Sequence, residues 1–433
     1  MTTIKELAST KLSLAELVAV FTGGATDSLR FTAYDGSSAG AEDAALGMDL
    51  LTPRGMTYLA TAPGELGLSR AYVSGDLVAR GVHPGDPYEL LKLLAEDLKF
   101  TRPSPRLLAS IVRAVGIEHL RLPPPPPQEV LPRWRRLAEG LRHSKTRDAE
   151  AISHHYDVSN TFYAWVLGPT MTYTCAVYPE PEATLEMAQE NKYRLIFDKL
   201  RLQSGDRLLD VGCGWGGMVR YAARRGVRAI GATLSAEQSA WARTAIETEG
   251  LGELAEVRHC DYRDIGETGF DAVSSIGLTE HIGVKNYPSY FGFLKSKLRT
   301  GGLLLNHCIT RNNNKSNYRA SSFTDRYVFP DAELTGSGRI LSEIQDVGFE
   351  VLHAENLRHH YAMTLRDWSQ NLVAHWDEAV AEVGIGKAKV WGLYMAGSRV
   401  SFEQNNIQLH HVLASKLAEH GARDLPLRPW WQP

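Results

Sequence analysis

The feature that most constrains this chain is a regular alternation of short apolar runs with helical segments between residues 207 and 310. The apolar runs are RLLDVG, VRAIGATL, AEVRHCDY, FDAVSSIG and GGLLLNHCIT, and helical patterns such as SAEQSAWARTAIETEG lie between them. Apolar strands separated by helices predict a mostly parallel sheet that is covered on both faces. We therefore predict an α/β fold for this part of the chain.

A run of five prolines at 123–127 divides the sequence, because it can hold only a stiff polyproline conformation. Residues 1–122 mix helical runs with a hairpin-like stretch, RFTAYDGSSAG, and predict a small α+β domain. Residues 123–150 form a Pro-rich and basic linker, and 151–433 form the larger domain, with a helical cap over about 311–410. The linker segment PRWRRLAEGLRHSKTR predicts a basic amphipathic helix, which either docks on the larger domain or contacts acidic lipid headgroups.

Composition excludes several classes of protein. The chain of 433 residues is 43% hydrophobic and 22% charged, with a net charge of −3, so it offers no global attraction to nucleic acid. No apolar stretch is long enough for a membrane span, and the first residues lack the pattern of a secretory signal, so we expect a cytoplasmic protein. The four cysteines are far apart in the sequence, which predicts reduced thiols rather than disulfides or a zinc site.

The segment LLDVGCGWGGM, residues 208–218, predicts a ligand-binding turn at the end of a strand. Its spacing Gly212-x-Gly214-x-x-Gly217 fits the dinucleotide fingerprint, in which backbone N–H groups approach a ligand at the start of a helix. A nicotinamide cofactor would need an acidic residue at the end of the next strand, yet that strand ends GATLSAEQ, with no acid before Glu237. The pattern therefore favours another adenosine-containing ligand.

In sheets of this kind, ligands bind beyond the carboxyl ends of the strands. We expect the strand ends to converge on one crevice, at Gly212, Thr233, Asp261, Glu280 and His307.

At these residues the chain resembles a known family. The segment LLDVGCGWGG is similar to the first motif of class I S-adenosylmethionine (SAM) dependent methyltransferases, in the form typical of the cyclopropane fatty acid synthase family. Four more segments match that family in order: HHYDVSNTFYAWVLGPTMTYTCAVY, TLSAEQ, SIGLTEHIG and MAGSRVSFEQNNIQLHHV. The resemblance implies a Rossmann-like SAM methyltransferase domain with a helical lid insertion, preceded by a small α+β domain.

The chemistry implied by this resemblance is methyl transfer to a carbon–carbon double bond. An alkene is a weak nucleophile and its attack on the sulfonium methyl leaves a carbocation, so the site must be dry, must present aromatic faces and must hold a base. The family uses a bound bicarbonate as that base. The resemblance assigns the bicarbonate pocket to Cys175 (chiefly its backbone N–H), Glu280, His307, the Ile309 backbone and Tyr394.

The same resemblance assigns the SAM-binding residues. They are Tyr173, Thr174, Asp210, Gly212, Cys213, Gly214, Trp215, Gly216, Thr233, Gln238, Asp261 and Tyr262. Tyr156 matches a family position near the site. The histidine pairs 154/155, 359/360 and 410/411 suggest metal ligands, but adjacent histidines on regular structure point in different directions, so we expect no metal.

Thr279 stands where cyclopropane synthases commonly have phenylalanine, and this difference bears on the product. The chain is most similar to the actinobacterial branch of the family, which makes the 10-methylene precursor of tuberculostearic acid from oleoyl chains of phospholipids. The resemblance implies an unsaturated phospholipid substrate at the inner membrane surface, a separate flavin-dependent reductase and a homodimer. Cyclopropane formation is the near alternative; a nicotinamide oxidoreductase and a non-catalytic lipid-transfer protein are more distant ones.

Overall fold

The computed structural model describes residues 13–21, 28–97, 123–129, 159–314, 318–319, 322–329, 332–418, 421 and 425–432. The basic helix predicted in the linker and Tyr156 lie outside these ranges. The chain divides into two compact units. The N-terminal unit comprises 1–131, 321–328 and 372–400, and the sheet unit comprises 132–320, 329–371 and 401–433. Within the described ranges, no helix combines the length and apolar character that a bilayer crossing requires.

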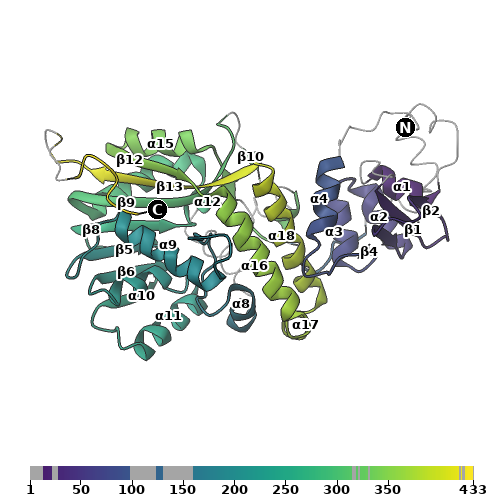
Figure 1. The fold of residues 1–433 in the computed structure, drawn as a ribbon, viewed down its shortest axis with the longest axis horizontal. Coiled ribbons are helices and arrows are strands. Elements are labelled where there is room, and N and C mark those ends of the chain that lie inside the picture. The colour runs from purple at the N-terminus through teal and green to yellow at the C-terminus, as the bar shows by residue number, and fades with distance from the viewer. Residues whose placement is uncertain are drawn as a thin grey trace. The chain divides into compact units, whose positions relative to one another are not determined.

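The sheet unit is built on a seven-stranded sheet of order β12-β13-β9-β8-β5-β6-β7 (Figure 1). Parallel pairing joins β5 (Arg207–Val211), β6 (Arg228–Thr233), β7 (Ala255–His259), β8 (Phe270–Ile276) and β9 (Leu298–Arg311). The strand β13 (Ile407–Lys416) runs antiparallel to both of its neighbours, β9 and β12 (Phe349–Asn356). The α/β fold with a mostly parallel sheet, predicted from the apolar runs, is confirmed.

Helices cover both faces of this sheet, because successive residues of each strand point to opposite sides. Leu208 packs in the core with α9 (Leu185–Lys199), α10 (Gly217–Ala223) and α11 (Ala236–Thr248). Its neighbour Leu209 packs in a second core with α13 (Tyr287–Lys297) and α15 (Ser337–Asp346). The order of connections reverses between β5 and β8, so the carboxyl ends of these two neighbouring strands form the switch point at which ligands bind in such sheets.

Shorter elements complete the sheet unit. They are α8 (Asn160–Leu167), α12 (Thr279–Ile282), α16 (Arg358–Ala374), β10 (Tyr318–Arg319), β11 (Glu333–Leu334) and the 3-10 helices η2 (Tyr262–Asp264) and η3 (Val284–Asn286), and the end of α16 lies within the N-terminal unit.

The structure corrects the boundaries of the cap that we predicted over about 311–410. This stretch contains α15, which packs on the sheet beside α13, and β12, which is a strand of that sheet. Three of its helices fall wholly or largely in the N-terminal unit: α14 (Ser322–Tyr327), α17 (Trp376–Val383) and α18 (Ile385–Glu403). A helical pattern shows that a segment is amphipathic, but it does not show against which unit the apolar face packs.

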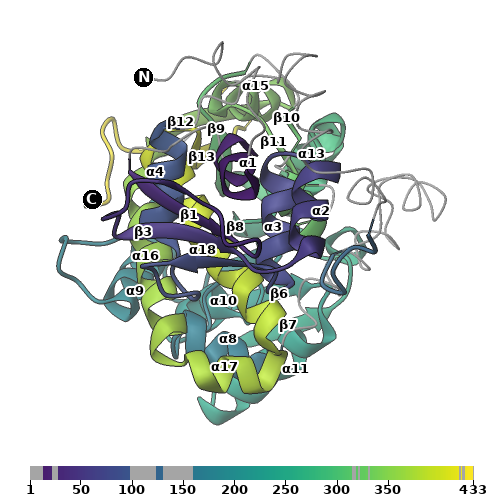
Figure 2. The same cartoon turned by 90° about the vertical axis from the view of Figure 1, so that its right-hand side faces the viewer.

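The N-terminal unit contains a four-stranded sheet of order β2-β1-β3-β4, of which Figure 2 labels β1 and β3. The predicted hairpin is confirmed, because β1 (Leu29–Ala33) and β2 (Ser38–Gly40) pair antiparallel, while β3 (Leu46–Leu50) and β4 (Leu77–Arg80) extend the sheet. Four helices contribute side chains to its core: α1 (Leu14–Phe21), α2 (Pro53–Thr61), α3 (Glu65–Val73) and α4 (Tyr88–Asp97).

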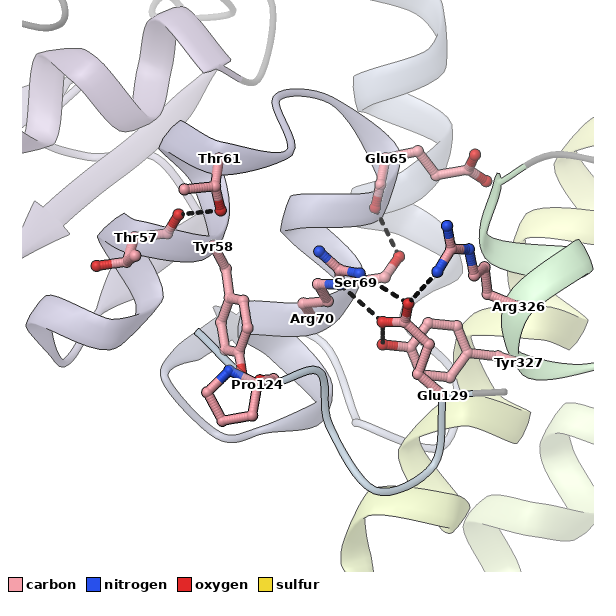
Figure 3. Close-up of polar contacts among 10 residues, drawn as sticks. All are labelled: Thr57, Tyr58, Thr61, Glu65, Ser69, Arg70, Pro124, Glu129, Arg326 and Tyr327. Carbon is pink, nitrogen blue, oxygen red and sulfur yellow. Dashed lines mark hydrogen bonds and ion pairs between the residues drawn. The ribbon is translucent and has the colours of Figure 1, made fainter. Parts of the chain in front are cut away.

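A buried carboxylate fixes the described part of the proline segment within this unit (Figure 3). Glu129 accepts hydrogen bonds from Nε and Nη2 of Arg70 on α3, both at 2.7 Å, and from Arg326 Nη1 on α14 at 2.8 Å. The Tyr327 hydroxyl donates a further bond at 3.3 Å, and the side chain of Glu129 is 1% exposed. The proline segment is therefore held to α3 and α14 by one carboxylate with several donors.

Candidate active site

The glycine loop between β5 and α10 adopts a backbone that favours glycine. Gly212 and Gly216 both have φ of +74°, and Gly216 precedes the first turn of α10. Asp210 at the end of β5 is buried and accepts a hydrogen bond from the Ser274 hydroxyl at 2.6 Å. Burial raises the pKa of Asp210 to about 6, against the opposing effects of Ser274 and Lys192.

A cavity of about 80 Å³ opens at this loop. Its lining includes these predicted SAM-binding residues: Tyr173, Thr174, Asp210, Gly212, Cys213, Gly214, Trp215 and Gln238. It also includes residues that sequence analysis did not single out: Met171, Thr172, Tyr193, Met218, Ile276 and Gly277. The glycine loop and residues 172–174 thus line the same cavity, although they are about forty residues apart in the chain.

The other predicted SAM-binding residues lie at neighbouring strand ends without lining this cavity. The Thr233 hydroxyl donates to Gln238 Oε1 at 2.7 Å and so positions that amide. The Asp261 carboxylate accepts the Arg263 backbone N–H at 2.9 Å, and Tyr262 packs edge-on against Tyr290 with the ring centroids 5.4 Å apart. Together with Gly216 in the turn, these residues keep their SAM-binding roles as predictions.

Lys192 on α9 is a buried cation that sequence analysis missed. Its ammonium donates to the Thr174 hydroxyl at 2.8 Å and to Gln189 Oε1 at 2.7 Å. Burial lowers the pKa of Lys192 to about 7. Its positive charge opposes the rise that burial causes in the pKa values of Cys175 and Asp210, and it adds to the lowering of the His307 pKa by burial. A signal was present, because Lys192 shares a helical face with the apolar Ile196.

Glu280 and Ile309 are brought together as the resemblance implied. Glu280 lies on the short helix α12 after β8, and its Oε1 accepts the Ile309 backbone N–H of β9 at 2.6 Å. The other oxygen, Oε2, is buried and makes no hydrogen bond to any described residue. Burial raises the pKa of this carboxyl to about 7, and the Ile309 N–H opposes that rise.

His307 lies two residues before Ile309 on β9. Its strand partner on β8 is Ile276, and its carbonyl accepts the Gly277 N–H at 2.8 Å. The Nδ1 atom bonds His411 at 2.8 Å, whereas Nε2 is buried and bonds no described residue. Cys175 is also buried, which raises the pKa of its thiol and keeps it neutral. A neutral thiol agrees with the prediction that the backbone of Cys175, rather than a thiolate, serves the pocket.

Tyr394 belongs to the N-terminal unit. It lies on α18, where its ring packs edge-on against Trp391 with the centroids 6.0 Å apart. Its predicted part in the bicarbonate pocket stays a prediction.

Aromatic rings gather beside the cavity. The Tyr173 ring lies 5.9 Å from that of Tyr163 and 5.3 Å from that of Trp368, and Trp215 lies 4.9 Å from Tyr163. Such faces stabilise a positive charge in a desolvated site. The Thr279 position provides no ring. Its hydroxyl is buried and donates to Asn306 Oδ1 at 2.6 Å.

The adjacent histidines 410 and 411 point in different directions, as predicted. The His410 ring pairs with the Thr310 hydroxyl at 2.8 Å, whereas the His411 ring pairs with His307. The two imidazoles therefore have different partners on β9 and do not form a shared ligand pair.

The sheet order, the glycine loop after β5 and the polar groups at the strand ends define the class I SAM-dependent methyltransferases. Comparison with known proteins identifies the family within this class. The family model described as mycolic acid cyclopropane synthetase matches residues 143–412. The chain belongs to that family, and it is a SAM-dependent methyltransferase.

Relatives of named function agree with this assignment. A protein of Mycobacterium tuberculosis named "Probable fatty acid methyltransferase" is 75% identical over 98% of this chain and 99% of its own length. A tuberculostearic acid methyltransferase of the same organism is 32% identical over 62% of this chain and 65% of its own. A solved mycolic acid cyclopropane synthase in complex with SAH and CTAB has a TM-score of 0.58 and 29% identity, covering 62% of this chain and 98% of its own.

Proposed function

We propose that the protein transfers the methyl group of SAM to the double bond of an oleoyl chain in a phospholipid, giving a 10-methylene acyl chain. The observation that carries this proposal is that two buried polar atoms, Glu280 Oε2 and His307 Nε2, bond no described residue. The His307 carbonyl accepts the N–H of Gly277, which lines the cavity at the glycine loop. Buried polar groups are normally paired, so such atoms favour a small polar ligand. The names of the fatty acid methyltransferase and the tuberculostearic acid methyltransferase support the acyl substrate.

The chain's own residues prepare the methyl donor. The backbone at the glycine loop and the start of α10 approaches the ligand closely, and Gln238, fixed by Thr233, offers its amide to the adenosine portion. Tyr173 and Thr174 close the cavity on the side of the aromatic rings, and Lys192 fixes the Thr174 hydroxyl. These contacts orient the sulfonium methyl toward the acyl chain.

The polar atoms beside the cavity fit bicarbonate. Glu280 Oε2 can meet the hydroxyl of the ion, and a protonated His307 Nε2 can donate to one of its oxygens. When bound, bicarbonate would supply the base for proton removal. The Ile309 N–H, assigned to the ion by the family resemblance, instead donates to Glu280 here, so its role is to hold that carboxyl in place.

The surroundings suit a short-lived carbocation. Trp368 is fully buried, the Tyr173 ring lies beside it, and the Tyr163 ring lies beside that of Tyr173, so water is excluded and negative ring faces are available. The Cys175 thiol is kept neutral, so it is a poor trap for the cation.

Two products can follow from the cation. Loss of a proton from the new methyl group closes a cyclopropane ring, whereas a hydride shift followed by proton loss leaves an exocyclic methylene. The buried, hydrogen-bonded Thr279 removes an aromatic wall common in cyclopropane synthases, and this supports the methylene product. Cyclopropane formation remains the alternative because the matching family model carries that name.

The test is incubation of the full chain with labelled SAM, bicarbonate and oleoyl phospholipid vesicles, followed by ozonolysis and mass spectrometry of the acyl chains. Both products gain the same mass, but ozone cleaves only the methylene. We expect an ozone-sensitive product; a labelled, ozone-resistant chain would identify a cyclopropane synthase. A methylene product would require a separate reductase, and we propose a flavin-dependent one. Action at the inner membrane surface and a homodimeric state are parts of the same proposal, tested by vesicle flotation and by sedimentation.

A further inference from the structure

A line of buried polar side chains leads away from His307, on the side opposite its unbonded nitrogen. His307 of β9 and His411 of β13 are register partners, and Nδ1 of His307 lies 2.8 Å from Nε2 of His411. Both rings are 1% exposed. In the sequence His411 is only one half of a histidine pair, and its contact with a candidate catalytic residue is visible only in the fold.

The line continues to the edge of the sheet. Lys199, at the end of α9, places Nζ 3.1 Å from His411 Nδ1 and forms an ion pair with Glu355 of β12. Glu355 is itself the register partner of His411, so three adjacent strands bring these side chains together. Lys199 is fully buried and Glu355 is 26% exposed. We call His307, His411, Lys199 and Glu355 the histidine–lysine chain.

The chain has a direction because a lysine ammonium can only donate hydrogen bonds. Lys199 donates to Glu355 and to His411 Nδ1, so His411 must carry its proton on Nε2. That proton is donated to His307 Nδ1, so His307 in turn carries its proton on Nε2. Burial and the lysine charges lower the pKa values of both histidines, which keeps each imidazole neutral with one donor and one acceptor.

We propose that Lys199 and His411 are positioning residues that hold His307 in the tautomer with the proton on Nε2, so that this nitrogen is a hydrogen-bond donor into the candidate bicarbonate pocket. The identity of the ion that receives the bond rests on the proposed function, whereas the tautomer does not. An acceptor at this position would repel the oxygens of an anion, so the direction of the chain decides whether His307 can hold one.

The C-terminal tail shields the lysine from water. The Trp431 ring centroid lies 5.5 Å from Lys199 Nζ, and Trp430 Nε1 donates to the Asp198 carbonyl at 2.8 Å. His353 of β12 packs edge-on against Trp431, with the centroids 5.0 Å apart. Trp430 and Trp431 thus cover the outer part of the histidine–lysine chain.

The direct test is the tautomer of His307, read by two-bond ¹H–¹⁵N NMR correlations in the full chain labelled with ¹⁵N-histidine. A His307→Gln variant identifies the signals of that ring. We expect wild-type His307 to carry its proton on Nε2, and Lys199→Met to shift the ring toward a mixture of both tautomers. Lys297→Met is the matched control, because Lys297 is also buried but donates to the Ile265 carbonyl on another part of the sheet unit.

Lys199→Arg tests the direction of the hydrogen bond to His411 separately from the shape of the site, because arginine, like lysine, can only donate hydrogen bonds. We expect it to keep the Nε2 tautomer that Lys199→Met loses. Wild-type His307 protonated on Nδ1, or a tautomer unchanged in Lys199→Met, would overturn the proposal.

Kinetics separate this proposal from the proposed function. We expect Lys199→Met to lower kcat by roughly 10- to 100-fold, in the range found for groups that orient a ligating histidine, with the Kd for SAM unchanged. If the wild-type chain showed no methyl transfer to oleoyl phospholipid, the proposed function would fail while the tautomer result stood. If methyl transfer occurred and the His307 tautomer was the same in Lys199→Met as in the wild type, only the present inference would fail.

Discussion

The carboxyl group of Glu280 joins two neighbouring strand ends, because Oε1 accepts the Ile309 N–H at 2.6 Å, while Oε2 is buried and bonds no described residue. One oxygen fixes the side chain, and the other is the atom that we propose acts on the ion. The residue is therefore held in place without a charged partner among the described contacts of its carboxyl group.

Replacing this carboxyl should separate turnover from donor binding. Glu280→Gln keeps an oxygen for the Ile309 N–H but loses the group proposed to orient the base, so we expect kcat to fall by roughly 10²- to 10³-fold, with the Kd for SAM within about twofold of wild type. Steady-state kinetics and calorimetric titration with SAM measure the two quantities. The matched control is Glu333→Gln, whose carboxylate also accepts one backbone N–H, that of Val284 at 3.2 Å, and which should keep full turnover. An equal loss of SAM affinity in Glu280→Gln would assign the residue to the donor instead.

The same substitution should change how stability depends on pH. The pKa of Glu280 is raised from 4.5 to about 7 in the folded protein, so the folded state holds this proton over a range in which the unfolded state has released it. The contribution of this group to the free energy of unfolding is therefore fully present below pH 4.5. It decreases above that pH and is lost as the pH rises through 7. Between pH 5 and pH 8, the free energy of unfolding of Glu280→Gln should therefore increase by up to about 3 kcal/mol relative to that of the wild type. Urea unfolding at several pH values measures the difference, and parallel curves for the two proteins would contradict the raised pKa.

A single methyl group should disturb the cavity at the start of α10, where we propose that SAM binds. A Cβ on Gly217 would lie 2.0 Å from the Tyr193 hydroxyl, which is fixed by a 2.8 Å bond to Thr172. We expect Gly217→Ala to lower the free energy of unfolding by about 1–3 kcal/mol and to weaken SAM binding, because this close-packed wall cannot absorb the added atom. Gly252→Ala, where nothing lies within 4 Å of the added Cβ, is the control and should behave as wild type. Normal SAM affinity in Gly217→Ala would mean that Tyr193 can move away freely.

In the N-terminal unit, Glu129→Gln should loosen the proline segment. Removing the charge leaves Arg70 buried without its carboxylate partner. Loss of one partner of a buried ion pair lowers the free energy of unfolding by about 3–5 kcal/mol. Hydrogen exchange is the suitable measurement, because it reports on α3 and α14 locally; we expect faster exchange there and little change in β5 to β9. The exposed Glu96 provides the control variant, Glu96→Gln. Unchanged protection of α3 would show that Arg70 finds another partner.

Local patterns were sufficient for much of the fold and for part of the site. The strands β5 to β9 and the turn at Gly212 follow from apolar runs and from a backbone that glycine favours, and both are properties of neighbouring residues. Lys192, Lys199 and His411 could not be assigned in this way. A lysine within a helix ordinarily predicts a solvated face, and only the assembled sheet shows that these lysines are buried.

The predicted boundaries of the cap differ from the structure for a related reason. The sequence between 322 and 403 indicates helices, but a helical pattern does not show which unit each helix packs against. The Thr233–Gln238 bond is a contrasting case, because its two partners lie only five residues apart in the chain.

The N-terminal unit takes residues 321–328 and 372–400 from within the later part of the chain, so the polypeptide passes between the units repeatedly. A single cut after residue 131 would therefore leave the whole sheet unit in one piece, but it would separate the helices at 321–328 and 372–400 from the rest of the N-terminal unit. A graft that exchanges the first 131 residues between methyltransferases must match those helices, because they remain with the sheet unit in the polypeptide.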